Sequence, residues 1–281
     1  MNNMTLNENI GHFYDSSTKL WLDVWGEHMH HGYYGVDGKD KKGNQQAQND
    51  LIQQLLEWGG ITAADRILDA GCGIGGSARF LARRYGAQVH GLTLSKVQAE
   101  EARAYNDKAQ LGNQITIAVQ DMLTITPKDG LYDMVWSMES AEHIPAKKQL
   151  METFYEVLKP GGKLLMATWC VRETPPKFSN EALKVLEKIG SLYHIPPMIS
   201  MEEYKKIMAD TGFVGVKSAD WTVSVSPFWK AVLQSAKNAS SILGLIRAGW
   251  PAIRGAWALQ YMVKGYDMGL LKFGVIQGRK A

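Results

Sequence analysis

Cysteine and net charge are both scarce in this chain of 281 residues. Its only two cysteines, Cys72 and Cys170, stand far apart, with no CxxC pair and no histidine at metal-ligand spacing. This pattern excludes a disulfide framework and predicts free thiols in a reducing compartment. The net charge is only +3, and no block of lysine and arginine with interleaved aromatics occurs. A nucleic-acid-binding function is therefore not expected.

Long apolar runs are also missing. The most apolar region, residues 240–263, is interrupted by Arg247 and Arg254, so it falls short of the roughly 20 apolar residues of a membrane-spanning helix. The polar opening MNNMTLNENI lacks the apolar segment of a secretory signal. We expect a soluble, cytoplasmic protein that can touch a membrane surface and that needs no obligate protein partner.

Strand and helix patterns alternate from residue 66 to residue 169. Apolar runs predict strands, and apolar positions at helical spacing predict the helices between them, at 77–85, 95–110 and 145–158. The strands are predicted at 66–70, 87–94, 114–119, 132–137 and 163–169. Such alternation is typical of a parallel sheet with right-handed crossovers. With two later strands, it predicts an α/β fold with a doubly wound, Rossmann-like, seven-stranded mixed sheet.

The rhythm divides the chain into three parts. We expect an N-terminal lid segment at 1–45, a cofactor-binding core at 46–170, and a C-terminal half at 171–281. In the last part we read 171–200 as irregular and proline-rich, and 227–264 as apolar and helical. These two segments are predicted to be insertions that form an apolar substrate chamber, and the last two strands complete the sheet.

A glycine-rich turn, DAGCGIGG, joins the first predicted strand to the first helix. Its glycines satisfy GxGxxG, so an NAD-binding oxidoreductase stays open at this point. Asp69, two residues before the first glycine, would suit an ammonium group and would repel a pyrophosphate. The second strand ends in GLTLS, without the acid that binds the ribose of NAD. Asp121 and Met122, after the third strand, suit an adenine ring, so the pattern favours S-adenosylmethionine.

Several motifs carry a resemblance to a known family. The chain resembles Rossmann-type S-adenosylmethionine methyltransferases in DAGCGIGG, GLTLSKVQ, YDMVWSMESAEHI and LKPGGKLLMATW. The likeness to tocopherol O-methyltransferases extends to the opening FYD…LWLDVWGEHMHHGYYG and to the late GYDMGLLKFGVIQG, so it covers nearly the whole chain. The TLS-x-x-Q element is shared with sterol C-methyltransferases, alkaloid N-methyltransferases and cyclopropane fatty acid synthases.

The resemblance implies a set of cofactor-binding residues in the loops after the strands. The glycines Gly71, Gly73 and Gly75 would line the methionine part of the cofactor, and the residues after the second and third strands would meet its ribose and adenine. The full predicted set is Asp69, Gly71, Cys72, Gly73, Gly75, Thr93, Leu94, Ser95, Gln98, Asp121, Met122 and Ser137.

Three titratable residues follow the fourth strand. Glu139, Glu142 and His143 are spaced i, i+3 and i+4, so one helical turn would place them on one face. A histidine held by a carboxylate is a suitable general base for a phenol or an amine. We expect His143, helped by Glu139, to take the proton; the resemblance to the alkaloid relatives implies the same. The alternative is that one acid contacts the cofactor or caps a helix.

The opening segment is crowded with aromatic and histidine residues. We predict that it folds over the cofactor as a lid through Tyr14, Trp25, His31, Tyr33 and Tyr34, since aromatic faces exclude water and suit a sulfonium cation. The alternative is that these side chains only anchor the segment to the core. No metal site is expected here, because adjacent histidines do not share a helix face as His-x3-His does.

We expect an enzyme that methylates a bulky, apolar small molecule, and the preferred reaction is O-methylation of a tocopherol-like phenol. N-methylation of an alkaloid or indole and C-methylation of an isoprenoid are the rival reactions. From other classes, an NAD-dependent oxidoreductase and a non-catalytic cofactor sensor stay open.

Overall fold

The centre of the molecule is a seven-stranded sheet with the order β3-β2-β1-β4-β5-β7-β6. The computed structural model describes residues 5–229 and 250–281. The strands are β1 (Arg66–Ala70), β2 (Gln88–Thr93), β3 (Ile115–Val119), β4 (Tyr132–Met138), β5 (Leu158–Val171), β6 (Phe213–Asp220) and β7 (Leu271–Lys280). The first five are parallel, and β7 is antiparallel to both neighbours. This confirms the predicted Rossmann-like mixed sheet.

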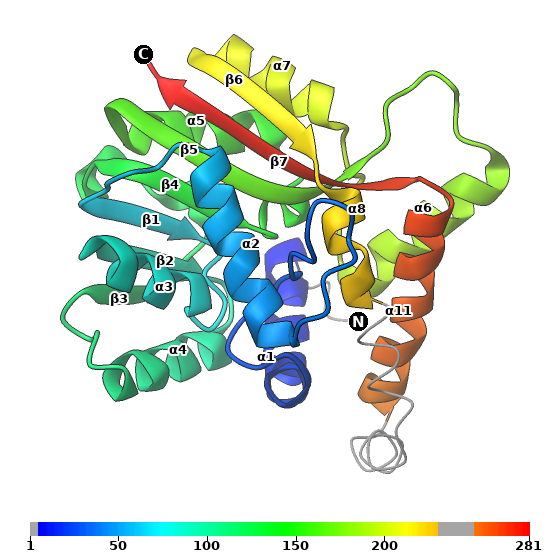
Figure 1. Ribbon diagram of the computed structural model, residues 1–281, viewed down its shortest axis with the longest axis horizontal. Helices are drawn as coiled ribbons and strands as arrows, with labels where there is room; N and C mark the ends of the chain where they lie inside the picture. The colour runs from blue at the N-terminus through cyan, green and yellow to red at the C-terminus, as the bar shows by residue number, and fades with distance from the viewer. Residues whose placement is uncertain (1–4, 230–249) are drawn as a thin grey trace.

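Helices cover both faces of this sheet (Figure 1). The described helices are α1 (Leu6–Trp25), α2 (Asn44–Trp58), α3 (Gly76–Tyr85), α4 (Lys96–Lys108), α5 (Lys147–Val157), α6 (Asn180–Tyr193), α7 (Met201–Thr211), α8 (Thr222–Val225) and α11 (Trp250–Asp267). Side chains of β1 alternate between two apolar clusters: Ile67 belongs to one with α2, α3 and α4, whereas Leu68 belongs to the other with α5 and α7. The sheet is therefore buried on both sides, as a doubly wound fold requires.

The carboxyl ends of the parallel strands face a group of helices that lies outside the alternating core. Figure 1 shows α1, α6, α8 and α11 beyond that edge. Helix α1 begins with a capping box, in which Thr5 and Glu8 bond reciprocally. These helices enclose the edge at which ligands bind in open α/β sheets.

One expectation about the C-terminal half is wrong. Residues 171–200 are not irregular throughout, because α6 occupies Asn180–Tyr193. Ser179 caps the helix by accepting a hydrogen bond from the Ala182 N–H, and the buried positions Val185 and Ile189 follow at helical spacing. Helix α6 packs against α11. The centre of the predicted insertion 227–264, residues 230–249, lies outside the described residues.

The first residues of β5 also differ from the prediction. Leu158 already pairs with Tyr132, and the register shifts before Lys163 pairs with Met134. The sequence KPGG, which precedes the predicted strand 163–169, therefore forms an irregular first part of β5.

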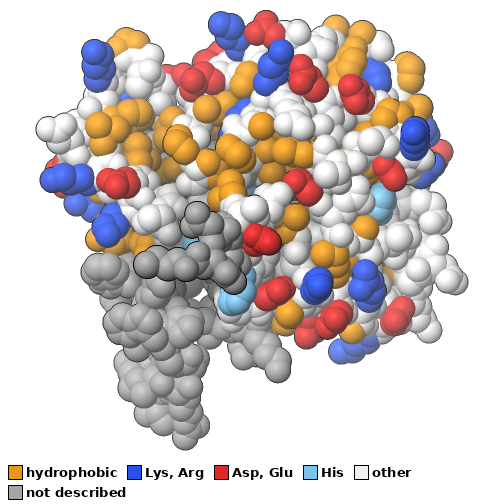
Figure 2. Space-filling view, turned by 180° about the vertical axis from the view of Figure 1, so that it is seen from behind, with side chains coloured by type: hydrophobic (Ala, Val, Ile, Leu, Met, Phe, Trp, Pro, Cys, Tyr) orange, Lys and Arg blue, Asp and Glu red, His pale blue; other side chains and the backbone are white. Residues whose placement is uncertain are grey.

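The surface carries both charge signs. Figure 2 shows acidic and basic side chains interspersed with apolar ones over the face opposite to the view of Figure 1. Among the described helices, none is long and apolar enough to cross a bilayer.

Candidate functional site

A cavity lies at the carboxyl edge of the sheet and encloses about 870 Å³ of empty space, its open mouth included. It is lined by the loops after β1, β2, β3 and β4 and by parts of the N-terminal segment. We call it the donor cavity. Nine predicted cofactor residues line it: Asp69, Gly71, Cys72, Gly73, Thr93, Leu94, Gln98, Asp121 and Met122. The topology brings these residues together because the carboxyl ends of parallel strands meet at one edge.

Asp69 places a buried carboxylate in the donor cavity. The residue is 1% exposed, and burial raises the pKa of its carboxyl group to about 7, although the Ala78 N–H lowers it in part. Its Oδ2 has no hydrogen-bond partner among the described residues. A buried carboxylate oxygen without a partner is unfavourable, and a cation would satisfy it. The cavity therefore fits a ligand that carries an ammonium group.

The glycine turn brings the loops after β1 and β4 close together. Gly71 has a φ of +88°, and a Cβ there would lie 2.3 Å from the Cβ of Ser140. The Ser140 hydroxyl donates to the Ala70 carbonyl at 2.6 Å and lies 2.9 Å from the Ser137 hydroxyl. Ser137 does not line the donor cavity; its hydroxyl supports the contact between the two loops, and its cofactor contact stays a prediction.

The next two glycines of the turn face different surroundings. Gly73, at φ +54°, lines the donor cavity, and apart from its chain neighbours no described residue has an atom within 4 Å of an added Cβ. Gly75, at φ +76°, is the left-handed residue before α3, and its added Cβ would meet Arg79. Gly75 thus shapes the start of the helix and does not line the cavity, and its role toward the cofactor stays a prediction.

Hydrogen bonds within the TLS-x-x-Q element hold its side chains in place. Thr93 Oγ1 donates to Gln98 Oε1 at 2.9 Å and accepts from the Ser95 N–H at 3.2 Å. The Ser95 hydroxyl accepts from the Gln98 N–H and so forms the N-cap of α4. Ser95 acts as this cap and is not part of the cavity wall, whereas Thr93 and Gln98 are held against the cavity.

Helix α1 lies over the donor cavity and is bonded to three of its loops. Asn7 Nδ2 donates to Asp121 Oδ2 at 2.7 Å, and the Ser95 hydroxyl donates to Asp15 Oδ1 at 2.5 Å. The Tyr14 hydroxyl and His143 Nε2 share a hydrogen bond of 2.9 Å. These contacts support the expectation that residues 1–45 form a lid.

The segment after α1 supplies cavity residues that the sequence did not reveal. Glu27 Oε2 accepts from Arg79 at 3.0 Å, and a Cβ on Gly76 would lie 2.6 Å from His28 Nδ1, so this strap passes directly over the start of α3. Cavity-lining residues missed from sequence include His28, Met29 and His30. The crowded histidines are evident in the sequence, but their spacing does not connect them with the glycine turn, which lies more than forty residues further along the chain.

A second, smaller cavity adjoins the donor cavity and encloses about 410 Å³. We call it the acceptor cavity. Five residues line both cavities and mark their junction: Tyr14, Met29, His30, Glu139 and His143. The remaining wall is mainly aromatic and is formed by His31, Glu142, Trp169, Tyr193, Ile195, Phe228 and Trp229. Two adjoining cavities with a shared wall suit a reaction between two ligands.

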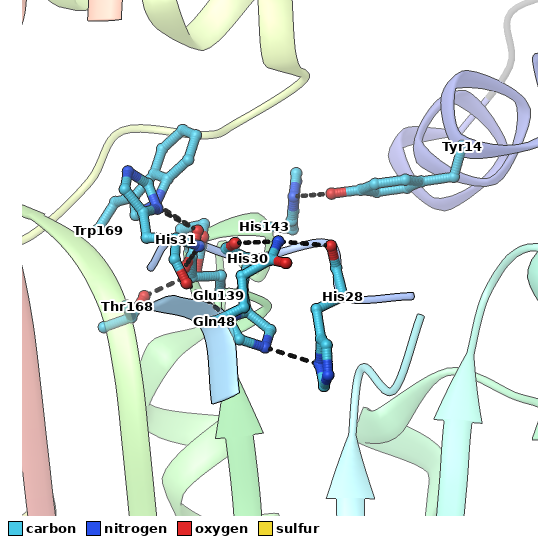
Figure 3. Close-up of polar contacts among 10 residues, drawn as sticks. Tyr14, His28, His30, His31, Gln48, Glu139, His143, Thr168 and Trp169 are labelled. Carbon is cyan, nitrogen blue, oxygen red and sulfur yellow. Dashed lines mark hydrogen bonds and ion pairs between the residues drawn. The ribbon is translucent and has the colours of Figure 1, made fainter. Parts of the chain in front are cut away.

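The three residues after β4 do not share one face of a helical turn. Glu139 has a left-handed φ of +50°, and only Glu142 and His143 belong to the short 3-10 turn η3 (Ala141–His143). Glu139 turns toward the N-terminal segment: Oε1 accepts from the His31 N–H and Oε2 bonds His31 Nδ1, both at 2.7 Å (Figure 3). Trp169 Nε1 also donates to Oε2, at 3.1 Å. The expectation that Glu139 orients His143 is therefore wrong.

Burial sets the protonation of this group. Burial alone would raise the pKa of Glu139, but the facing His31 side chain and backbone N–H hold it below its ordinary value. Burial, together with the negative Glu139, raises the pKa of Glu142, whose Oε2 accepts from the Thr168 hydroxyl at 2.8 Å. Burial lowers the pKa of His143 to about 4. At neutral pH the junction thus holds an ionised Glu139 and a neutral His143.

The predicted lid aromatics divide between two roles. Tyr14 lines both cavities. The Tyr33 ring packs against Trp221 at 5.4 Å, and the Tyr34 N–H donates to the Ser224 carbonyl, so both lie away from the two cavities and anchor the segment to the core. The contacts of these two tyrosines fit the alternative, in which they anchor the segment to the core. The side chain of Trp25 lies outside the described residues.

Comparison with known proteins places this arrangement among methyltransferases. Residues 2–210 match the family described as mycolic acid cyclopropane synthetase. The chain is 39% identical to a probable tocopherol O-methyltransferase, chloroplastic, of Oryza sativa subsp. japonica, over 98% of the chain and 78% of that protein. It is 36% identical to the tocopherol O-methyltransferase, chloroplastic, of Arabidopsis thaliana, over 98% and 82%. A putative sarcosine dimethylglycine methyltransferase from Galdieria sulphuraria shares the fold, with a TM-score of 0.82 at 24% identity over 96% of the chain and 98% of that protein.

Proposed function

Since this chain belongs to the mycolic acid cyclopropane synthetase family of S-adenosylmethionine-dependent methyltransferases, we propose that it methylates the phenolic hydroxyl of a tocopherol-like molecule. The observation that carries the proposal is the aromatic acceptor cavity, which meets the donor cavity at Glu139, the carboxylate that is paired with His31 of the acceptor cavity. Aromatic walls suit a phenolic ring, and the polar pair suits its hydroxyl. The two plant relatives, named as tocopherol methyltransferases, support the same acceptor class.

The donor cavity would hold S-adenosylmethionine through residues at the carboxyl ends of β1, β2 and β3. In this proposal Asp69 balances the ammonium group, Thr93 and Gln98 bind the ribose, and Asp121 and Met122 contact the adenine. When bound, the cofactor supplies a methyl group activated by its sulfonium. The chain itself must exclude water and align the acceptor with that methyl group.

Access to both cavities would be controlled by segments outside the alternating core. We assign the lid role to residues 1–45, because α1 is bonded to the loops that line the donor cavity. The acceptor chamber is assigned to the C-terminal half, which contributes Tyr193, Phe228 and Trp229, together with Trp169 from the end of the core. A cytoplasmic location stays a prediction, because both plant relatives are named as chloroplastic proteins.

The proposed function is tested by incubating the protein with methyl-labelled S-adenosylmethionine and a panel of tocopherols, alkaloids and isoprenoids. We expect label in a tocopherol product only, and magnetic resonance of that product locates the new methyl group. Transfer to an amine or to an isoprenoid carbon, with tocopherols untouched, would contradict the proposal.

Donor binding is expected to weaken as the pH falls through 7. The raised pKa of Asp69 belongs to the free protein, and a bound ammonium group would lower it, so binding must release a proton wherever Asp69 is still protonated. Donor affinity is therefore at its full value above pH 7, and it falls as the pH drops from 7 towards the lower pKa that Asp69 has in the complex. Calorimetry with S-adenosylhomocysteine at pH 7, in buffers of different ionisation enthalpy, should show release of about half a proton from this group. Asp69→Asn is the control, and equal proton release from it would contradict the assignment.

A further inference from the structure

His31 lines the acceptor cavity and has a buried ring nitrogen without a partner among the described residues. The side chain is 1% exposed, and its Nε2 has no hydrogen-bond partner among the described residues. The ring is enclosed by Trp229, Phe228 and Phe273, with centroids at 4.9, 5.0 and 5.2 Å. His31 lines the acceptor cavity but not the donor cavity. A polar atom in such a position indicates that a ligand completes its hydrogen bonding.

The hydrogen bond at the other ring nitrogen, Nδ1, determines the tautomer of His31. Glu139 is ionised, so the 2.7 Å contact requires that His31 Nδ1 carries the proton and donates it to Oε2. In the neutral ring Nε2 then holds a lone pair directed away from Glu139. The carboxylate is itself held by the His31 N–H and by Trp169 Nε1, so the pair is fixed from several sides (Figure 3). This is the arrangement in which a carboxylate orients a histidine that acts as a base.

We propose that His31 is a catalytic residue whose Nε2 accepts the proton of the phenolic hydroxyl, with Glu139 as its positioning residue. The inference rests on the proposed function, because it needs an acceptor with an acidic hydroxyl. The O–H bond breaks and an N–H bond forms at Nε2, which leaves the electron pair on the phenolate. That pair forms the bond to the methyl carbon, while the carbon–sulfur bond breaks and leaves its pair on sulfur. Glu139 stabilises the imidazolium until it releases the proton to water.

His143 is less suited to this step. Its Nε2 already shares a hydrogen bond with the Tyr14 hydroxyl, and no carboxylate bonds to it in the contacts described. Burial also lowers its pKa to about 4, which makes it a weak proton acceptor. We therefore assign His143 to positioning at the junction, through Tyr14.

The test compares His31→Asn with His143→Asn on a series of chromanols whose ring substituents withdraw electrons increasingly. The asparagine amide can still donate to Glu139, but it offers no base where Nε2 lies. For a weakly acidic chromanol we expect His31→Asn to lower kcat about 100-fold or more. The loss should shrink along the series and disappear for a chromanol that is already ionised. For His143→Asn the loss should stay constant along the series.

Two further measurements separate catalysis from folding. S-adenosylhomocysteine affinity and Tm are recorded for every variant, and we expect the affinity of His31→Asn to stay within about threefold of wild type. Glu139→Gln serves as the second variant, because its amide oxygen still accepts the Nδ1 proton although the charge is gone. It should show a smaller loss with the same dependence on chromanol acidity, and it carries the test if His31→Asn does not fold.

The outcomes distinguish the assignment of His31 as the base from the proposed methylation of a phenol. If wild type methylates chromanols and the His31→Asn and Glu139→Gln losses do not change with acidity, the function stands and His31 is not the base. If His143→Asn shows the acidity-dependent loss instead, the assignment of the base is reversed. If wild type binds S-adenosylhomocysteine but methylates no chromanol, both proposals are overturned.

Discussion

Asp69→Asn is expected to weaken S-adenosylmethionine binding by at least about 30-fold at pH 8. At that pH the wild-type carboxylate is largely ionised, since its pKa is about 7. The variant leaves a buried ammonium group facing a neutral amide, and removing one partner of a buried charge pair costs about 2–5 kcal/mol. Each 1.4 kcal/mol is a factor of ten in affinity. Calorimetry with S-adenosylmethionine and S-adenosylhomocysteine measures the change.

The matched control is Asp133→Asn, at the opposite end of the sheet. Asp133 accepts from Lys159 Nζ and from the Arg66 N–H, so its loss should lower stability without changing donor affinity. The free Asp69→Asn protein should be at least as stable as wild type at pH 8, because a buried charge has been removed. An Asp69→Asn variant with undiminished donor affinity would show that the ammonium group binds elsewhere.

Gly71→Ala is expected to destabilise the fold by about 3 kcal/mol or more. The new methyl group would meet the Ser140 Cβ at 2.3 Å, and the backbone at φ +88° is unfavourable for alanine. Ser140 cannot move away freely, because its hydroxyl is bonded to the Ala70 carbonyl. In a chain of this size such a loss lowers Tm by roughly 6–12 °C. Thermal unfolding of the free protein measures it.

Gly73→Ala is the control for the glycine turn, because we expect it to cost little stability and to weaken donor binding instead. Apart from its chain neighbours, no residue of 5–229 or 250–281 comes within 4 Å of its added Cβ, so the free protein should lose only about 1 kcal/mol from the left-handed backbone. The methyl group would instead occupy the donor cavity, and we expect roughly tenfold weaker donor binding. Equal Tm losses in the two variants would contradict the assignment of Gly71 to the contact between the loops and of Gly73 to the cavity wall.

Sequence periodicity predicted the core because local patterns determine it. The alternating apolar runs and glycines between residues 66 and 169 specify strands buried on both faces, and a parallel sheet then places their loops at one edge. The donor residues Asp69, Thr93 and Asp121 could be predicted together for that reason. Helix α6 could also have been predicted from its Ser179 cap and its apolar spacing, but the prolines on either side of it suggested an irregular segment.

The acceptor side could not be predicted in the same way. The partnership of His31 with Glu139 joins residues 108 positions apart, and it depends on a left-handed backbone at a glutamate, which helical spacing argues against. Spacing along the chain therefore assigned Glu139 to the wrong histidine. The positions of Tyr33 and Tyr34 likewise depend on packing against residues near 221–224, which the order of residues does not reveal.

The two cavities draw their walls from different stretches of the chain. Most of the donor side comes from loops before residue 145, whereas the aromatic side of the acceptor cavity comes from residues 169–229. Substitutions in that later stretch can reshape the acceptor's compartment while leaving the donor's contacts in place. Acceptor preference in such a protein can therefore change by small steps, each of which keeps a working methyl donor site.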